Sequence, residues 1–421
     1  MYIPQNSNSP RDENQIEAEF PADTKRSWII CVSCFFCLFL CQGVDNSYGI
    51  YQNHYTSIVF PNDLPSKISW IGSITTAFML ITGIFSGKIT SSLGFRNANW
   101  IGGFVSFLGL IIASFVNSII LLMLTQGAML GIGCGFIYSN SLSITSMWFE
   151  KYRGLALGIA ISGSGIGGLA ISGLTSIIMD SLGHRWALRI TAFAFLIIIG
   201  LVSIPFKSRV SLKENTELIN FSYLKYPIFF FVLLTGFIGS IGYVVPIFML
   251  PSVALQIGTS ESFSSNLILI FNVGYFLGSI ITGKIADYIG PANMFGLCTF
   301  FIGFFPLVFW VAFKSSTSLI IVAFFYGFFI CGFSSLCIAT IGKYYDDKKT
   351  TAMNGVFFFF MGTSLIIGNF AIQLFLDRLG NGTNYRYIAA FASACQIFAS
   401  LFALPTIYFI RKQSLNKSWL N

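Results

Sequence analysis

The chain alternates long apolar stretches with short polar segments, and twelve of the stretches have the roughly 20 residues that a helix needs to cross a bilayer. They lie near 28–50, 67–87, 98–117, 119–145, 154–178, 186–206, 226–250, 263–284, 292–313, 317–342, 351–376 and 387–409. We expect the stretch at 119–145 to be kinked or to start late. The pattern predicts an all-α membrane protein with twelve transmembrane helices.

The composition supports this interpretation and argues against a soluble protein. Apolar residues make up 55% of the chain and charged residues only 10%, where about 25% charged residues is usual. A soluble protein of this size must cover its surface with polar side chains, and this chain cannot. We therefore expect the lipid bilayer as its surroundings, a small-molecule substrate, no nucleic acid and no required protein partner.

The distribution of positive charge predicts the orientation. Of the 24 Lys and Arg residues, six fall on the predicted outer side. These six are Lys67, Arg185, Arg189, Lys314, Arg378 and Arg386. The other 18 fall on the side of the two termini, and such an excess is typical of cytoplasmic segments. We expect both termini in the cytoplasm and the protein in the plasma membrane, with a vacuolar or other endomembrane as the alternative.

The two halves of the chain repeat each other. An offset of 196 residues lays Ser86–Asn97 on Thr282–Asn293 without a gap, so that Gly94 meets Gly290. Parallel repeats of this kind are typical of secondary transporters. The predicted organisation is a polar, disordered N-terminus at 1–27, a six-helix bundle at 28–206, a cytoplasmic linker at 207–225, a second six-helix bundle at 226–410 and a cytoplasmic tail at 411–421.

The repeated loops carry a recognisable motif. They resemble the G-x-x-x-D-R-x-G signature of the major facilitator superfamily. The second copy keeps Gly283, Asp287 and Gly290, whereas the first has Ser91 and Ser92 where the acid and the base belong. The resemblance implies the major facilitator fold, in which two six-helix bundles enclose a central site.

Other segments narrow the resemblance. The sequence WFEKYRGLALGIAISG at 148–163 resembles the signature of the monocarboxylate porter family. The segments GCGFIYSNSLSITSMWF, HRWALR, NSYGIYQNHY and NVGYFLGSIITGKIADYIG resemble its fungal branch, which includes riboflavin transporters. The resemblance implies a secondary transporter that moves a small organic solute, monocarboxylate-like or riboflavin-like, by alternating access.

The chain also departs from that family. Animal members carry an aspartate and an arginine on helix 8, and these places fall at Tyr275 and Ser279. The lysine that they carry on helix 1 falls at Asn46, and the two glycines expected before that helix are replaced within 23–26. Either another cation compensates for the missing charges or the substrate is not a simple anion.

A sensor and an enzyme are the two alternative classes of function. A nutrient sensor that has kept a transporter fold is the alternative, although such proteins usually have longer cytoplasmic tails. An enzyme is not expected, because the two histidines, His54 and His184, stand in no metal-ligand pattern. No cofactor is expected either, since the ferredoxin-like spacing of four cysteines at 31–41 falls within an apolar span rather than on a loop.

The first span carries the clearest candidate site. Gln42, Asp45, Asn46, Gly49 and Asn53 recur at steps of three and four residues and form one polar stripe. Polar side chains facing lipid are costly, so the stripe should face a central cavity, unless it only meets the headgroup zone. The predicted substrate contacts are Asn46, Tyr138, Asn140, Asn272 and Tyr275, with Arg189 as a further candidate.

Two gating contacts are predicted. The first is an ion pair between Asp45 and Arg189 in the outer leaflet; alternatively, Arg189 extends to the interface or binds an anionic substrate. The second is a cytoplasmic latch in which Asp287 bonds the start of the fifth helix and pairs with Arg153. Asp287 could instead cap a turn within its own loop.

One modification site is also predicted. Asn381 stands in an N-G-T sequence on an outer loop, where it could be glycosylated.

We expect the mirrored arm of the latch to be weak, because Ser91 replaces the acid that would meet the start of the eleventh helix near Lys349.

Overall fold

The computed structural model describes residues 20–63, 65–209, 221–243, 245–313, 315–345, 347–379 and 385–418. Within these ranges every regular element is a helix. The first half contains α1 (Lys25–His54), η1 (Tyr55–Val59), α2 (Pro65–Ile81), α3 (Gly83–Ala113), α4 (Ile119–Leu122), η2 (Met123–Met129), α5 (Leu130–Trp148), α6 (Arg153–Leu182), α7 (His184–Ala194), η3 (Phe195–Ile199) and α8 (Gly200–Val202). The second half contains η4 (Phe221–Lys225), α9 (Pro227–Ile241), α10 (Val245–Gln256), α11 (Glu261–Ile289), α12 (Pro291–Phe305), η5 (Pro306–Ala312), α13 (Ser316–Tyr344), α14 (Asp347–Leu379), α15 (Tyr385–Leu401) and α16 (Ala403–Ser418).

These elements run back and forth as two six-helix bundles, which confirms the predicted fold class. Nine helical stretches in the described part of the chain are long and apolar enough to cross a membrane, and α2 with α3 adds a tenth across a bend of 48°. The expected irregularity near 119–145 is present, since the π-helical segment η2 joins α4 to α5.

Two glycines at equivalent places in the halves turn the chain between helices. Gly94 has φ 81° and divides α3 into two helices, and Gly290 has φ 95° between α11 and α12. Residues with a Cβ atom rarely adopt this left-handed conformation. The offset that aligned the two loops therefore pairs the residues that make both turns.

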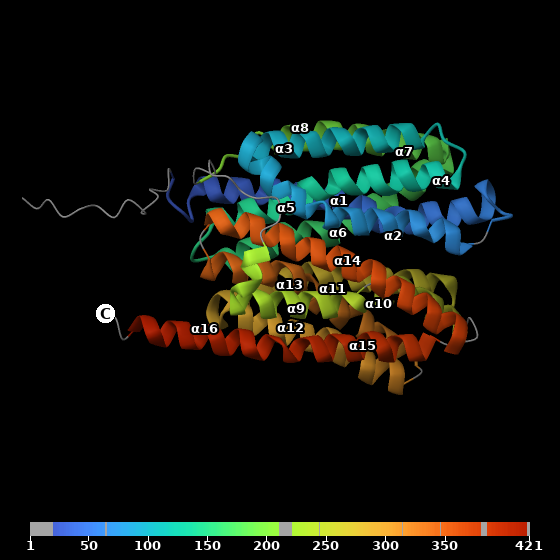
Figure 1. Ribbon diagram of the computed structural model, residues 1–421. Helices are drawn as coiled ribbons and strands as arrows, with labels where there is room; N and C mark the ends of the chain where they lie inside the picture. The colour runs from blue at the N-terminus through green and yellow to red at the C-terminus, as the bar shows by residue number, and fades with distance from the viewer. Residues whose placement is uncertain are drawn as a thin grey trace, which may run out of the picture.

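The helices run roughly parallel, and the two halves lie one above the other in Figure 1. The start of α1 and the end of α16 lie at the same end of the bundle, on the left of Figure 1. We call this end the terminal end and the other the opposite end.

The N-terminal segment is ordered further than predicted. Residues 20–27 are described, whereas 1–19 lie outside the described residues. Thr24 and Ser27 cap the start of α1 reciprocally, each side chain accepting from the backbone N–H of the other. The carboxylate of Asp23 accepts from three consecutive N–H groups at 150–152, at 3.3, 3.0 and 3.4 Å. The described segment before α1 is thus docked on the loop before α6.

The start of the predicted linker is ordered as well. The buried Arg209 pairs with Glu150 at 2.6 Å and donates to the carbonyls of Phe20 and Met147. Phe20 in turn stacks on Trp148, with ring centroids 5.7 Å apart. These contacts tie the N-terminal segment, the α5–α6 loop and the linker together at the terminal end.

The two halves meet mainly through α6 against α11 and through α14 against α2 and α3. Their closest approaches include Gly154 with Gly283 and Gly158 with Ser279. Both pairs lie in the part of α6 and α11 nearer the terminal end. The halves are therefore in contact at the terminal end, which is closed in this structure.

Candidate functional site

The predicted polar stripe of α1 lies away from the core of its own half. Asn46, Gly49 and Asn53 are exposed, whereas Gln42 and Asp45 are half-buried. The other face of α1 carries buried cysteines and packs closely on α6. The orientation of α1 therefore leaves the stripe available to a ligand.

Two amide side chains from different halves meet over a glycine of α6. A Cβ atom placed on Gly168 would lie 2.9 Å from Nδ2 of Asn46 and 2.7 Å from Oδ1 of Asn272. Asn272 donates through Nδ2 to the carbonyl of Ile268, but its buried Oδ1 has no hydrogen-bond partner. Since a buried acceptor is costly to leave unpaired, this oxygen marks a position where a ligand donor is favourable.

Tyrosines from both halves surround this pair of amides. Tyr138 of α5 donates to Oγ of Ser334 on α13, at 3.2 Å and across the interface between the halves. Tyr275 of α11 is half-buried and faces Ser164 of α6. Tyr243 lies within electrostatic range of Tyr138, Tyr275 and Asp45. The structure therefore brings four of the predicted contacts, Asn46, Tyr138, Asn272 and Tyr275, to one region between the halves.

The predicted ion pair between Asp45 and Arg189 is wrong for this state of the protein. Asp45 instead accepts from the hydroxyl of Thr76, which lies 3.1 Å from both carboxylate oxygens. Arg189 donates to Oγ of Ser114, and its guanidinium lies 4.6 and 5.1 Å from the ring centroids of Phe115 and Trp186. Two aromatic faces thus hold the cation, and it contacts the end of α3 rather than α1.

Asn140 also differs from its prediction as a substrate contact. It is fully buried, and its Oδ1 accepts from Ser86 at 2.8 Å and Thr90 at 2.6 Å. Its Nδ2 donates to Oδ1 of Asn99 at 3.0 Å. Asn140 therefore joins α3 to α5 inside the first half and is a structural residue.

We expect Asn140→Leu to destabilise the first half by about 1–3 kcal/mol, because it leaves the buried polar groups of Ser86, Thr90 and Asn99 short of partners. A lower midpoint of thermal unfolding in detergent would show this effect. Asn266→Leu is the matched control, because Asn266 lies exposed on α11 and outside this network. Equal midpoints for the two variants would contradict the structural role.

The predicted contact between Asp287 and the helix that follows the α5–α6 loop is present. Its Oδ1 accepts from Gly154 N–H at 2.7 Å and its Oδ2 from Leu155 N–H at 2.9 Å. These are first-turn amides of α6, which carry partial positive charge. Because a Cβ atom on Gly154 would lie 2.4 Å from the carbonyl oxygen of Gly283, only glycine fits this approach. We call these bonds the latch; its role in gating stays a prediction.

The predicted pairing of Asp287 with Arg153 is replaced by other contacts of Arg153. Arg153 donates through Nε to the carbonyl of Phe149 at 2.8 Å, and its guanidinium lies beside Gly342 of α13. Lys343 is the cation whose charge acts on Asp287. On the mirrored side, Ser91 donates to Lys88 within its own helix. Asn381 lies outside the described residues.

Sequence reasoning missed several partners. Thr76, Tyr243 and Ser334 sit in apolar or uniformly small-residue stretches, so no periodic pattern distinguished them. In the sequence, Asp23 stands only as a replacement for an expected glycine. It adopts φ 55°, the left-handed conformation that glycine tolerates best, and uses its side chain to cap the loop before α6. The missing glycine was the signal that could have identified it.

Two helical halves with polar side chains between them form the architecture of a membrane transporter. Residues 31–255 and 232–418 each match the sequence pattern of the Major Facilitator Superfamily. The chain belongs to this superfamily.

Relatives and solved structures agree with this assignment. The Aspyridones efflux protein apdF of Emericella nidulans is 27% identical over 388 residues, covering 91% of this chain and 78% of that protein. The MFS transporter asaE of Aspergillus flavus is 29% identical over 355 residues, covering 84% and 80%. The fucose:proton symporter FucP of E. coli shares the fold with a TM-score of 0.70 at 15% identity, covering 90% of this chain and 99% of its own. The expected membership of the monocarboxylate porter family stays a prediction.

Proposed function

We propose that this transporter moves a flat, uncharged organic molecule through a site formed by Asn46, Asn272, Tyr138 and Tyr275. The observation that carries the proposal is the pair of amides from opposite halves over Gly168, with Oδ1 of Asn272 buried and unpartnered. Amides donate and accept hydrogen bonds without charge, and tyrosine rings stack on planar solutes. A solute that bonds to both halves at once couples its binding to their relative movement.

The surrounding charges favour a riboflavin-like solute over a monocarboxylate. A carboxylate substrate needs a cation inside the membrane. The candidate cation, Arg189, is engaged by Ser114 and two aromatic rings. Asp45, the residue before Asn46 on α1, is acidic. The name of the relative from Emericella nidulans makes export the direction to test first.

The same proposal includes the orientation of the protein in the membrane and the side to which the central site is open. With 18 of 24 Lys and Arg residues on the side of the termini, the terminal end would face the cytoplasm. The closed terminal end then corresponds to an outward-facing state. We place the protein in the plasma membrane, as the sequence suggested.

The site is tested by efflux from and uptake into liposomes that contain the purified protein, with riboflavin and lactate as parallel solutes. We expect riboflavin transport to exceed lactate transport, and Asn46→Leu with Tyr275→Phe to reduce it by about tenfold or more, as expected when two hydrogen bonds are lost. Asn53→Leu is the control, because Asn53 lies on the same stripe two turns further along α1. Unchanged transport by the double variant would remove this site, and faster lactate transport would remove the solute class.

Asp45 adds a prediction about coupling. A half-buried carboxylate within a membrane span is costly when charged. Among the residues that the structure describes, the hydroxyl of Thr76 bonds it. We propose that Asp45 gains and loses a proton during transport. Asp45→Asn is expected to abolish transport driven by a pH gradient while keeping solute exchange at equal pH. Asp180→Asn, an exposed acid at the opposite end of α6, should change neither, and gradient-driven transport by Asp45→Asn would exclude the coupling role.

A further inference from the structure

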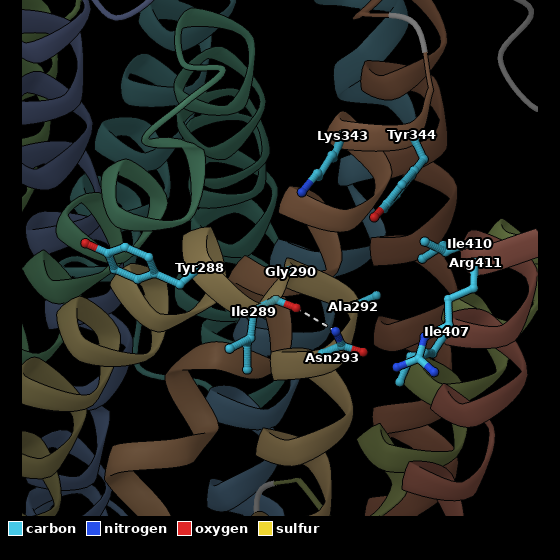
Figure 2. Close-up of a pocket in the computed structure, with 10 residues that line it drawn as sticks. All are labelled: Tyr288, Ile289, Gly290, Ala292, Asn293, Lys343, Tyr344, Ile407, Ile410 and Arg411. Carbon is cyan, nitrogen blue, oxygen red and sulfur yellow. Dashed lines mark hydrogen bonds between the residues drawn. The ribbon is translucent and has the colours of Figure 1, made fainter. Parts of the chain in front are cut away.

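The pocket at the terminal end of the second half does not bring a matched set of groups together. It encloses about 210 Å³ between α12, α13 and α16. Lys343 and Arg411 line it with side chains that point apart (Figure 2), and Lys343 acts on Asp287 of the latch. Two groups that do converge lie at the opposite end of the first half.

These two groups are the imidazoles of both histidines of the chain. His54 ends α1 and His184 begins α7. Nε2 of His54 lies 3.1 Å from Nδ1 of His184, so one ring donates a hydrogen bond to the other. Because 130 positions separate the two residues, no short ligand spacing connects them in the sequence, and only the fold shows that they form a pair.

The chain around the pair fixes the two rings. Gly183 ends α6 with φ 83°, a left-handed conformation that suits glycine, and so makes the turn that leads into His184. The ring of Tyr55, which is buried, stands at 85° to the ring of His184 with centroids 5.9 Å apart, and its hydroxyl donates to Gln126 at 2.9 Å. Both imidazoles are half-buried. Each ring therefore packs on the protein and is still accessible.

The two nitrogens have nearly the spacing of two ligands on one metal ion. In a tetrahedral site with Zn–N bonds of about 2.0–2.1 Å, neighbouring nitrogens lie about 3.3–3.4 Å apart. From 3.1 Å, a small rotation of the rings directs both lone pairs at one ion. Each neutral ring then carries its hydrogen on the nitrogen that faces away, so no proton is released. Imidazole suits Zn²⁺, Cu²⁺ and Ni²⁺, whereas Mg²⁺ and Ca²⁺ prefer oxygen ligands.

The surroundings determine how firmly such an ion is held. The charge of Asp180 acts on His54 and the charge of Arg185 acts on His184, so the nearby charges oppose each other. Among the residues that the structure describes, no third His, Cys, Asp or Glu joins the pair as a ligand. Water fills the remaining positions of the ion, as it fills the open position of a catalytic zinc site. The pair therefore suits an exchangeable ion rather than a permanent structural metal.

We propose that His54 and His184 together bind one divalent transition-metal ion, Zn²⁺ or Cu²⁺, which links the end of α1 to the start of α7. Asn46 of the central site lies eight residues before His54 on α1, about 12 Å along the helix. An ion that ties this end of α1 restrains the helix that carries Asn46, so it should also slow transport. This effect on transport rests on the proposed function, whereas binding of the ion does not.

The test measures Cu²⁺ binding to the full-length protein, purified with a histidine-free tag, by electron paramagnetic resonance. Cys395→Ser is the background, because the other eight cysteines are buried. We expect the signature of coordinated imidazole nitrogen, and affinity lower by at least about tenfold in His54→Phe and in His184→Phe, since even an outer partner of a ligand is worth that much. Phenylalanine keeps the ring packing without the nitrogens. Asp63→Asn is the control, because it removes a partly exposed acid from the same end of the protein.

A second arm uses Zn²⁺. Zn²⁺ should raise the midpoint of thermal unfolding where Mg²⁺ does not. His54→Phe should lose this rise, and His54→Cys, which supplies a thiolate ligand, should keep it. Equal metal affinities in the wild-type protein and both phenylalanine variants would overturn the site.

The effect on transport is measured separately in liposomes. Zn²⁺ should slow riboflavin transport by the wild-type protein but not by His54→Phe, and a chelator should restore the rate. Unchanged transport in protein that binds the ion would overturn the restraint of α1. Absence of riboflavin transport without any metal would contradict the proposed function instead, and the binding measurements would still decide the site.

Discussion

Replacing Gly158 with alanine is expected to open the terminal end and to slow transport by about tenfold or more. A Cβ atom at this position would lie 2.1 Å from the carbonyl oxygen of Ser279, on the facing backbone of α11. Overpacking of this kind costs about 1–3 kcal/mol. This cost destabilises the state in which α6 and α11 are in contact at Gly158. A free-energy difference of about 1.4 kcal/mol changes the ratio of the two populations tenfold.

The measurement is the distance between spin labels on the terminal ends of α6 and α11, recorded with the transport rate. The longer distance should dominate in the Gly158→Ala variant. Gly173→Ala is the control on the same helix, because nothing lies within 4 Å of a Cβ atom placed there. Wild-type distances in Gly158→Ala would show that this contact does not set the balance between the two states.

The close approach also shows which parts of the structure the sequence could predict. Small residues at four-residue steps, Gly154, Gly158 and Ser162, are typical of a helix that another helix approaches closely. The repeat likewise pairs Gly94 with Gly290, which make equivalent turns. Both inferences follow from the small or missing side chain, which allows a close helix approach or, at glycine, a left-handed backbone conformation. The candidate acid Asp287 was found for the same reason, because the motif around it fixes its place at the end of a helix.

The rotation of the helices was harder to predict. In α5 every residue from Gly133 to Trp148 is buried, so the sequence has no polar face to show which side meets the cavity. Asn140 and Tyr138 lie two positions apart, about 200° around a helix of 3.6 residues per turn, yet we assigned both to the substrate. The structure directs Asn140 to α3 and Tyr138 to the other half. Polar residues alone do not specify a direction when every neighbour is buried.

The ordered N-terminal segment was missed for a different reason. Residues 1–27 are polar, and composition alone predicted disorder. Phe20, Asp23 and Arg209 become ordered through contacts with residues more than 100 positions away, such as the bonds of Asp23 to the 150–152 amides. Neither local propensity nor periodicity contains such information.

Asp287→Asn is expected to weaken the latch, to shift the resting population toward the state open at the terminal end, and to slow transport severalfold. In the wild-type protein both carboxylate oxygens accept from first-turn amides of α6. An asparagine keeps one acceptor and places an NH₂ group against an N–H donor, so one charge-assisted bond is lost and one repulsive contact is gained. Each charged contact at a helix N-terminus contributes about 1–2 kcal/mol.

The result depends on where the two acceptor bonds go. Had Asp287 capped a turn within its own loop, the change would lower stability without altering the balance between states. Its bonds reach a helix of the other half, more than 130 residues away, so the change acts on the closed state. The shift is measured with the same spin-label pair and by transport rate. Asp63→Asn is the control, since Asp63 is a partly exposed acid that pairs with Lys67 at the opposite end. An unchanged distance and rate in Asp287→Asn would show that the contact does not act as a gate, and a lowered unfolding midpoint alone would assign it to stability.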